Sequence, residues 1–371
     1  MSFAWPSGEP DLWKDDRAWK AELAREWDLG YALVDNSRAW FGTRLGRQGI
    51  AELVRHSLLR VLQAEVPPRL EQWKLLNEEF FSQRPDVTLR VYHSAFDLAF
   101  LDHMPNVRRF SADCMLTAQN VQAVASLPDL ETLSIGIYDL TSFEFLNHVN
   151  DRLIQLGIFD TSSSKPSIST VARFNDLRFL SLHGQQKGIE AVSELRNLEK
   201  LTLGSISTPG LDFLVGLNNL WSLSIVLGGI RNLAALQTLP HLKFLELALV
   251  RGLSDLTPVS ETTGLQCLNL EQVRQVTNLP DLSCLDSLRR LAVIDMKGVH
   301  DLTPIRLAPK LEDILFTPGR SFAPSELRWI LELPNLKTAA FGFSTMKRKL
   351  AFDAVAATRG LSTRLTEFAF V

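Results

Sequence analysis

The sequence has 371 residues, a formal net charge of −3 at pH 7 and hydrophobic residues at 46% of its positions. This composition is typical of globular proteins and gives no general attraction to nucleic acid. No apolar run approaches the roughly 18 residues of a membrane helix, and the first residues lack the basic start and apolar core of a signal peptide. The three cysteines show no paired spacing, so the sequence indicates no metal site and no cofactor. We expect a cytoplasmic protein with no membrane or nucleic acid partner.

Residues 1–85 differ from the rest because they show no repeat and hold six of the eight tryptophans, at positions 5, 13, 19, 27, 40 and 73. Apolar stripes at helical spacing predict helices over residues 11–27 and 49–62, and a third that starts at Pro67 or Pro68. We interpret this part as a Trp-rich helical N-terminal cap over the first repeat. A separate docking module is the alternative.

From Asp86 onward, one template recurs in which apolar residues occupy the first, fourth and sixth places. Clear copies are "NLEKLTL", "NLWSLSI", "HLKFLEL" and "GLQCLNL", and successive copies begin 21 to 29 residues apart. Places three to seven predict a short strand whose fourth and sixth side chains point inward and whose third, fifth and seventh point outward. One such unit buries little by itself, so neighbouring strands must stack in parallel.

A second apolar row follows several strands, for example Leu211, Leu214 and Leu217. Its spacing of three predicts short helical or 3₁₀ returns on the opposite side of each unit. We call one strand with its return a rung.

With these repeats, residues 86–371 resemble the leucine-rich repeat family, and "GLSDLTPV" (252–259) and "GVHDLTPI" (298–305) resemble its short 22-residue intracellular class. The resemblance implies an α/β solenoid of about thirteen rungs, with a curved parallel sheet on the concave face and short helical or 3₁₀ returns on the convex face. One departure concerns the ninth place, where the family's Asn or Cys is replaced, for example by Ile206, Gly228 and Val250. Backbone carbonyls in that turn therefore need other partners.

Clusters of catalytic or metal-binding residues are weak in this sequence. His93, Asp97, Asp102 and His103 diverge around a predicted turn, and Cys267 has no histidine beside it on a neighbouring rung. We therefore expect no catalytic residues. The alternative is an enzyme whose site lies where the cap meets the first rungs, around Arg44, Arg47, Arg90 and His93.

The outward places of the strands predict a binding surface. The fifth places mostly hold small residues, so the sheet surface stays accessible there. Larger outward side chains at the neighbouring places stand above it. Basic residues come first along the chain, acids gather in the later rungs and aromatics lie between them, a mixture that suits a protein interface. The expected partner-binding residues are Arg90, Tyr92, Arg109, Asp113, Phe159, Phe179, His183, Lys200, Phe244, Glu246, Glu271, Arg290, Asp295 and Asp313.

Since the family generally supplies binding surfaces, the resemblance implies a non-catalytic protein-protein interaction scaffold that binds a protein partner on its concave face. One form of this is an antidote, or immunity protein, that occludes a bacterial toxin. A second hypothesis is a substrate-recognition adaptor that docks through residues 1–85.

At the other end, "TRLTEFAFV" fits the template with Phe368 and Phe370 in the inward places. We expect a final rung whose free strand edge pairs with a second copy in a homodimer, or adds a strand from the partner.

Overall fold

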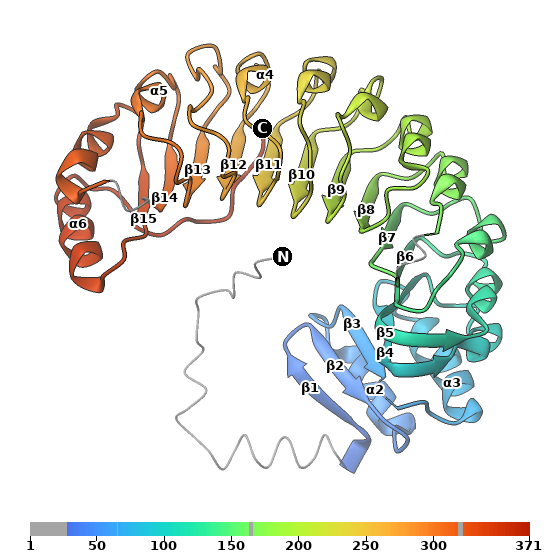
Figure 1. Ribbon diagram of the computed structural model, residues 1–371. Coiled ribbons are helices and arrows are strands. Elements are labelled where there is room, and N and C mark those ends of the chain that lie inside the picture. Colours follow the sequence, from blue (N-terminus) through green and yellow to red (C-terminus); the bar gives the residue numbers. More distant parts are fainter. Residues whose placement is uncertain (1–27, 65, 163–165, 318–321) are drawn as a thin grey trace. The chain divides into compact units, whose positions relative to one another are not determined.

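The computed structural model describes residues 28–64, 66–162, 166–317 and 322–371. The chain divides into two compact units, residues 1–139 with 148–150, and residues 140–147 with 151–371. Each unit is a sheet whose strands follow one another in chain order, with short helical segments between them (Figure 1).

Unit 1 contains six strands in its described part. They are β1 (Tyr31–Asp35), β2 (Arg38–Phe41), β3 (Val61–Ala64), β4 (Thr88–Asp97), β5 (Arg109–Gln119) and β6 (Thr132–Ile137). Its helices are α2 (Arg47–Arg55), α3 (Leu70–Leu76), a π-helical turn (Asn77–Phe81) and 3₁₀ turns at Leu98–His103 and Val121–Ser126. β1 and β2 are antiparallel, and every later pair in the unit is parallel.

Unit 2 contains nine parallel strands in its described part. They are β7 (Gln155–Ile158), β8 (Phe179–His183), β9 (Lys200–Gly204), β10 (Ser222–Val226), β11 (Phe244–Ala248), β12 (Cys267–Glu271), β13 (Arg290–Ile294), β14 (Asp313–Thr317) and β15 (Thr338–Phe341).

The convex side of unit 2 carries 3₁₀ turns at Glu144–Asn147, Ser169–Arg173, Ile189–Glu194, Asp212–Leu214, Ala234–Thr238 and Pro324–Glu332. It also carries α4 (Thr257–Ser260) and α5 (Thr303–Arg306), and α6 (Met346–Thr358) follows β15. Figure 1 shows the strands on the inner side of the arc of unit 2 and these turns on the outer side. The expected parallel sheet with short convex returns is confirmed.

The inward rows form a continuous apolar core. Leu223 and Ile225 of β10 lie beside Leu245 and Leu247 of β11 with no stagger, and all four side chains are fully buried. The second row is equally buried, as Leu211, Leu214 and Leu217 show. Burial of a leucine side chain contributes about 1.5–3 kcal/mol.

Backbone hydrogen bonds replace the missing side-chain ladder at the ninth place. The carbonyl of Ile206 accepts from Gly229 N (3.0 Å), and that of Gly228 accepts from Arg251 N (2.8 Å). The residue just before, in the eighth place, has a left-handed backbone in successive rungs, with φ of 54° at Ser205 and 60° at Leu227. This turn directs its N–H at the next rung, where Ser205 N donates to Val226 O (2.8 Å).

An asparagine ladder does exist, at the opposite end of the strands. Asn197 and Asn219 each precede the first place of a rung, and their Nδ2 atoms donate to Asn175 O (2.9 Å) and Arg196 O (3.0 Å) of the rung before. Asn335 does the same to Pro309 O (2.8 Å). The sequence template missed this ladder because it looked for asparagine after the strand.

The helical cap predicted for residues 1–85 is not confirmed. Residues 11–27 lie outside the described residues. The helix expected over 49–62 is wrong beyond Arg55, because Val61–Ala64 form β3, which pairs with β4. The third helix is confirmed as α3, whose Trp73 is buried and stacks on Phe100 with ring centroids 4.0 Å apart. The boundary at residue 85 stays a prediction.

β2 and β3 are degenerate rungs that sequence reasoning missed. Ala39 and Phe41 of β2, and Leu62 and Ala64 of β3, fill the fourth and sixth places and are buried. The carbonyl of Ser37 accepts hydrogen bonds from Arg60 N and Val61 N, which hold the second and third places of the next rung. The later rungs show the same pattern. Alanine in two inward places weakened the sequence signal.

The final rung predicted for residues 365–371 is also wrong. These residues form no strand, and β15 is the last strand in the described chain. The outer side of β15 is met instead by Ser362, which donates its N–H to Lys337 O (2.9 Å) and accepts from Ala339 N (2.8 Å). α6 also packs beside it, with Phe341 and Phe352 ring centroids 4.3 Å apart. Residues 365–371 therefore offer no strand edge to a second copy, and the chain itself covers the outer side of β15.

We expect the double change Asn197→Ala and Asn219→Ala to lower the free energy of unfolding by about 2 kcal/mol, because each residue loses one hydrogen bond worth about 1 kcal/mol. Urea unfolding followed by circular dichroism measures this. Asn218→Ala is the matched control, since its exposed side chain makes no such bond. An equal loss in the control would show that the ladder does not hold the rungs together.

Candidate functional site

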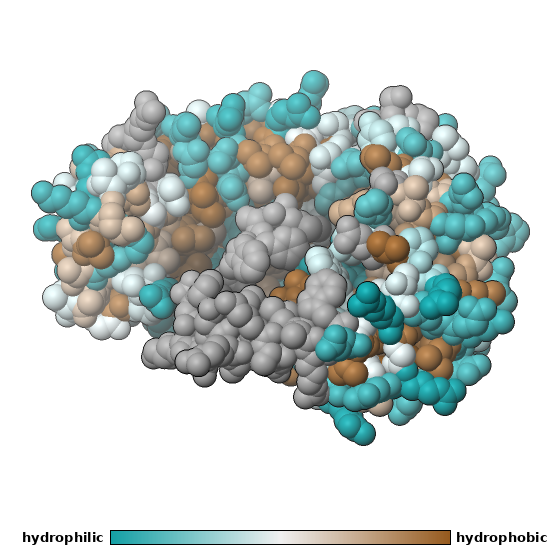
Figure 2. All heavy atoms as spheres, turned by 90° about the horizontal axis from the view of Figure 1, so that it is seen from below, coloured by the Kyte–Doolittle hydropathy of each residue, from teal (hydrophilic) through white to brown (hydrophobic). Residues whose placement is uncertain are grey.

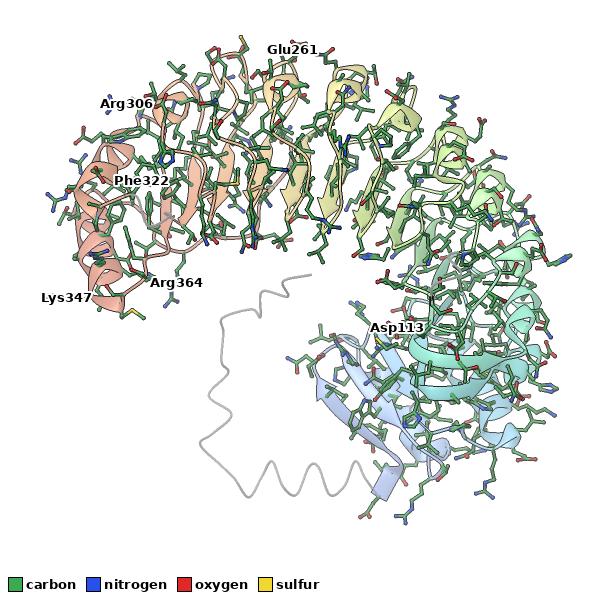
Figure 3. The ribbon with its side chains drawn as sticks, in the orientation of Figure 1. Asp113, Glu261, Arg306, Phe322, Lys347 and Arg364 are labelled. Carbon is green, nitrogen blue, oxygen red and sulfur yellow. The ribbon has the colours of Figure 1, made fainter. Side chains whose placement is uncertain are left out.

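The outward places of the strands bring thirteen of the predicted binding residues onto the concave face of each unit, whereas Asp295 holds an eighth place, just after β13. All fourteen are half-buried, so each side chain rests on the sheet and keeps part of its surface open. Unit 1 holds Arg90, Tyr92, Arg109 and Asp113, and unit 2 holds the other ten. In Figure 3, Asp113 is labelled on the strand side of unit 1, whereas Glu261 after α4 points outward from the convex side of unit 2.

In unit 1, Arg90 is the centre of a polar cluster. Its Nε donates to Asp113 Oδ1 (2.6 Å), its Nη1 donates to Gln63 Oε1 (3.0 Å), and its guanidinium carbon lies 4.7 Å from the Tyr92 ring centroid. Gln63 is buried on β3 and was missed because β3 was not recognised as a strand. The neighbouring Arg109 Nε is buried without a hydrogen-bond partner among the described residues. Arg90 is thus largely satisfied internally, which reduces its value for a partner.

In unit 2, aromatic and cationic side chains stand in two groups across β7 to β10, one where the strands end and one where they begin. Phe159 and His183 stack with ring centroids 5.0 Å apart. The Lys200 ammonium lies 5.1 Å from the Phe179 ring centroid and 4.6 Å from that of Trp221. We call Phe159, Phe179, His183, Lys200 and Trp221 the aromatic ridge.

Sequence reasoning missed Trp221 because it occupies a second place, which we had not counted as outward. The signal for it was present, since the second residue of a rung precedes the strand directly and Trp221 is one of only two tryptophans after residue 85.

Gly204 makes room for the ridge. It lies beside His183 in the parallel register, and a Cβ atom there would clash with His183 Nδ1. On the other side of the ring, His183 Nε2 lies 3.1 Å from Ser181 Oγ. Burial lowers the pKa of His183, and the nearby Asp160 opposes this only in part. The ring is therefore neutral at neutral pH and acts as a flat stacking surface.

The later rungs carry the acidic side chains, as expected. Arg290 and Asp313 occupy the same place on adjacent rungs, with Nη2–Oδ2 and Nε–Oδ2 distances of 2.7 and 3.1 Å. Asp295 lies 3.8 Å from Lys297 Nζ. Glu246 and Glu271 have no ion-pair partner among the described residues and remain the open charges of this surface.

Within the described ranges, no three His, Cys, Asp or Glu side chains come together as a metal site would need. Asp97 accepts hydrogen bonds from Ala99 N and Asn120 Nδ2, which is a turn-capping role. Burial raises the pKa of Cys267 to about 12, so its thiol stays protonated.

Two of the four residues that the enzyme alternative names make ion pairs with carboxylates. Arg47 pairs with Glu79 at 3.2 Å and Arg90 pairs with Asp113, so these two arginines are held in separate ion pairs.

Two members of the predicted surface in unit 2 are covered by the chain itself. Residues 363–371, which we call the return segment, run from α6 back past the later strands towards β11 (Figure 1). Phe370 lies against Phe244, with ring centroids 6.2 Å apart, and Phe368 lies 4.8 Å from the Arg290 guanidinium carbon. Figure 3 labels Arg364 near the start of this segment.

Outside the grey atoms, the face in Figure 2 mixes hydrophilic and hydrophobic residues. In the part of the chain that the structure describes, no helix has both the length and the apolar character needed to cross a bilayer.

No protein-family model matches the sequence, and the search of curated proteins returned no match. Solved structures do match. TLR13 in a complex with single-stranded RNA is 17% identical with a TM-score of 0.53, over 76% of this chain and 43% of that one. A leucine-rich repeat protein of Leptospira interrogans is 17% identical with a TM-score of 0.51, over 70% and 74%. An internalin of Listeria monocytogenes is 18% identical with a TM-score of 0.49, over 76% and 87%.

We expect unit 2 to lose stability as the pH falls below about 6.5, the ordinary pKa of histidine, because the unfolded chain then binds a proton that buried His183 resists. His183→Gln removes this group, so the variant should show a smaller fall in thermal midpoint between pH 7 and pH 5. His241→Gln, at an exposed position, is the control. Equal pH dependence in all three proteins would contradict the role of His183.

Proposed function

Since the chain has the leucine-rich repeat fold, we propose that it is a non-catalytic scaffold that binds a folded protein partner on the concave sheet face of unit 2. The aromatic ridge carries this proposal. Its rings stand half-exposed on strands that are hydrogen-bonded on both sides, so they lose little conformational freedom when a partner covers them. Aromatic side chains with a cation between them are typical interface anchors.

Protein is the favoured partner over RNA. Although TLR13 is solved with RNA, that similarity concerns the fold. In this chain Arg90 and Arg290 are already paired with carboxylates, and Glu246 and Glu271 lie on the same face as the ridge. These carboxylates would repel a phosphate backbone, whereas they suit a basic protein surface.

Within this function, we keep the finer proposal of an immunity protein that occludes a toxin, in a cytoplasmic setting. A rigid, half-buried ridge flanked by carboxylates suits a basic enzyme cleft as its target. Co-expression with the product of an adjacent gene, followed by measurement of that product's toxicity, tests it. An adaptor that docks through residues 1–85 is the other candidate, and it predicts a second binding partner for that part.

The central experiment is affinity capture with the full chain, followed by native mass spectrometry to find a stoichiometric complex. We expect Phe179→Ala to weaken the complex by about 2–4 kcal/mol, which is typical of an interface hot spot. The thermal midpoint should stay nearly unchanged, because Phe179 points outward from the core. Gln237→Ala on the convex side is the matched control.

Two outcomes would overturn the proposal. One is equal weakening by Phe179→Ala and Gln237→Ala. The other is a captured ligand that is nucleic acid and is released by nuclease.

A further inference from the structure

The return segment makes specific polar contacts with the beginnings of three adjacent rungs. Gln266 binds the backbone of Val371 on both sides, because Val371 N donates to its Oε1 (2.9 Å) and its Nε2 donates to Val371 O (2.7 Å). Lys243 Nζ donates to the same oxygen atom of Val371 (2.8 Å), and Arg289 Nη2 donates to Ala369 O (2.5 Å). These three side chains thus bind the backbone of an extended peptide.

Two aromatic side chains of the segment fill the spaces between these polar contacts. Phe370 packs against Trp221, with ring centroids 5.1 Å apart, and Phe368 lies 4.8 Å from the guanidinium carbons of both Arg289 and Arg290. Beside Phe370 a groove of ≈ 320 Å³ remains, lined by Trp221, Lys243 and their neighbours. We call Trp221, Lys243, Phe244, Gln266, Arg289 and Arg290 the entry row, since they hold the second and third places of β10 to β13.

The segment is held less firmly than a rung. Within the described chain, none of its residues makes a backbone–backbone hydrogen bond, although each strand of the sheet makes several. Phe370 keeps 37% of its surface exposed and Val371 keeps 82%. Such a segment is free to dissociate while the sheet beneath it stays folded.

We propose that the return segment is an internal ligand of a peptide-binding site formed by the entry row. The external ligand of this site is an extended polypeptide segment of the partner with two aromatic residues one residue apart, which displaces residues 363–371. The inference rests on the proposed function and deepens it. When the partner displaces the return segment, Phe244 and Arg290 are uncovered and extend the binding surface of the aromatic ridge beyond Trp221.

The alternating pattern follows from the geometry of the site. Backbone groups of the bound segment face Gln266 and Arg289, while its aromatic side chains face Trp221 and Arg290. A ligand must supply both features to replace what the return segment supplies now.

The first test uses a fluorescent synthetic peptide with the sequence of residues 362–371. It is titrated against the full-length wild-type chain and against the full-length variant Phe368→Ala/Phe370→Ala. The variant should bind the peptide roughly ten- to hundredfold more tightly, because its site is no longer occupied from within. Adding Trp221→Ala to that variant should remove the gain.

Matched controls exist in the same segment. Thr366→Ala/Glu367→Ala changes two exposed residues whose side chains make no hydrogen bond or ion pair with the described residues, so its affinity for the peptide should equal that of the wild type. A peptide in which both phenylalanines are alanine should not bind. Equal binding by the wild type and Phe368→Ala/Phe370→Ala, or binding of the alanine peptide, would overturn the inference.

A second measurement reports on the site without any peptide. Cys267 lies between Phe244 and Arg290 in the sheet register and is only 3% exposed. In a Cys114→Ser/Cys284→Ser background, its labelling by a thiol reagent should be at least tenfold faster in Phe368→Ala/Phe370→Ala than in the chain with the native return segment. Unchanged labelling, with circular dichroism showing both proteins folded, would mean that the segment does not cover the site.

The outcomes also separate this inference from the proposed function. In one outcome, a protein partner binds and Phe179→Ala weakens that complex, but the peptide binds the wild type and Phe368→Ala/Phe370→Ala equally. The proposed function then stands, and the proposal that the return segment is an internal ligand is wrong. If the peptide behaves as expected while Phe179→Ala leaves partner capture unchanged, the peptide site stands and the aromatic ridge loses its role.

Discussion

The hydrogen bonds between successive rungs hold the rest of this protein in place. At the start of each strand from β8 to β15, one carbonyl accepts two amides of the next rung, as Glu199 O accepts from Trp221 N and Ser222 N. At the end of the strand, the left-handed eighth residue extends the ladder by one more bond. Because the ladder is fixed at both ends, equivalent residues of adjacent rungs lie side by side. This alignment turns a linear repeat into a surface.

Much of the fold could be predicted because the inward places answer to a simple physical demand. A leucine in the fourth or sixth place must be buried, and only the stacking of one rung on the next buries it. Residues such as Leu223 and Leu245 therefore suffice to predict the parallel sheet. Ala39 and Ala64 meet the same demand with less apolar surface, which is why β2 and β3 escaped notice. Phe368 and Phe370 show the opposite failure. They match the template, but spacing does not state which surface they contact, and they lie against the entry row instead of forming a new rung.

The candidate site was predictable in location and less so in detail. Outward places follow directly from the strand period, and all fourteen expected residues have partly open side chains. What the sequence could not supply was the set of contacts that these residues make with each other. Arg290 and Asp313 occupy equal places on adjacent rungs and neutralise one another, and Arg90 uses Gln63 from a strand that was not recognised. Trp221 and Lys243 occupy second places, which we had not counted as outward. Only their contacts with the return segment show that these places belong to the surface.

The left-handed residues at the strand ends also offer a way to strengthen the molecule. Leucine is a poor occupant of this backbone region, which costs a residue with a side chain about 1–2 kcal/mol, yet Leu227 and Leu249 both occupy it. Glycine relieves that strain but loses about 0.5–1 kcal/mol through its freedom in the unfolded chain, so the net gain per site is small. Because the same position recurs from rung to rung, such gains add along one rim of the solenoid. An engineer could raise the melting temperature in this way without changing the outward side chains of the strands.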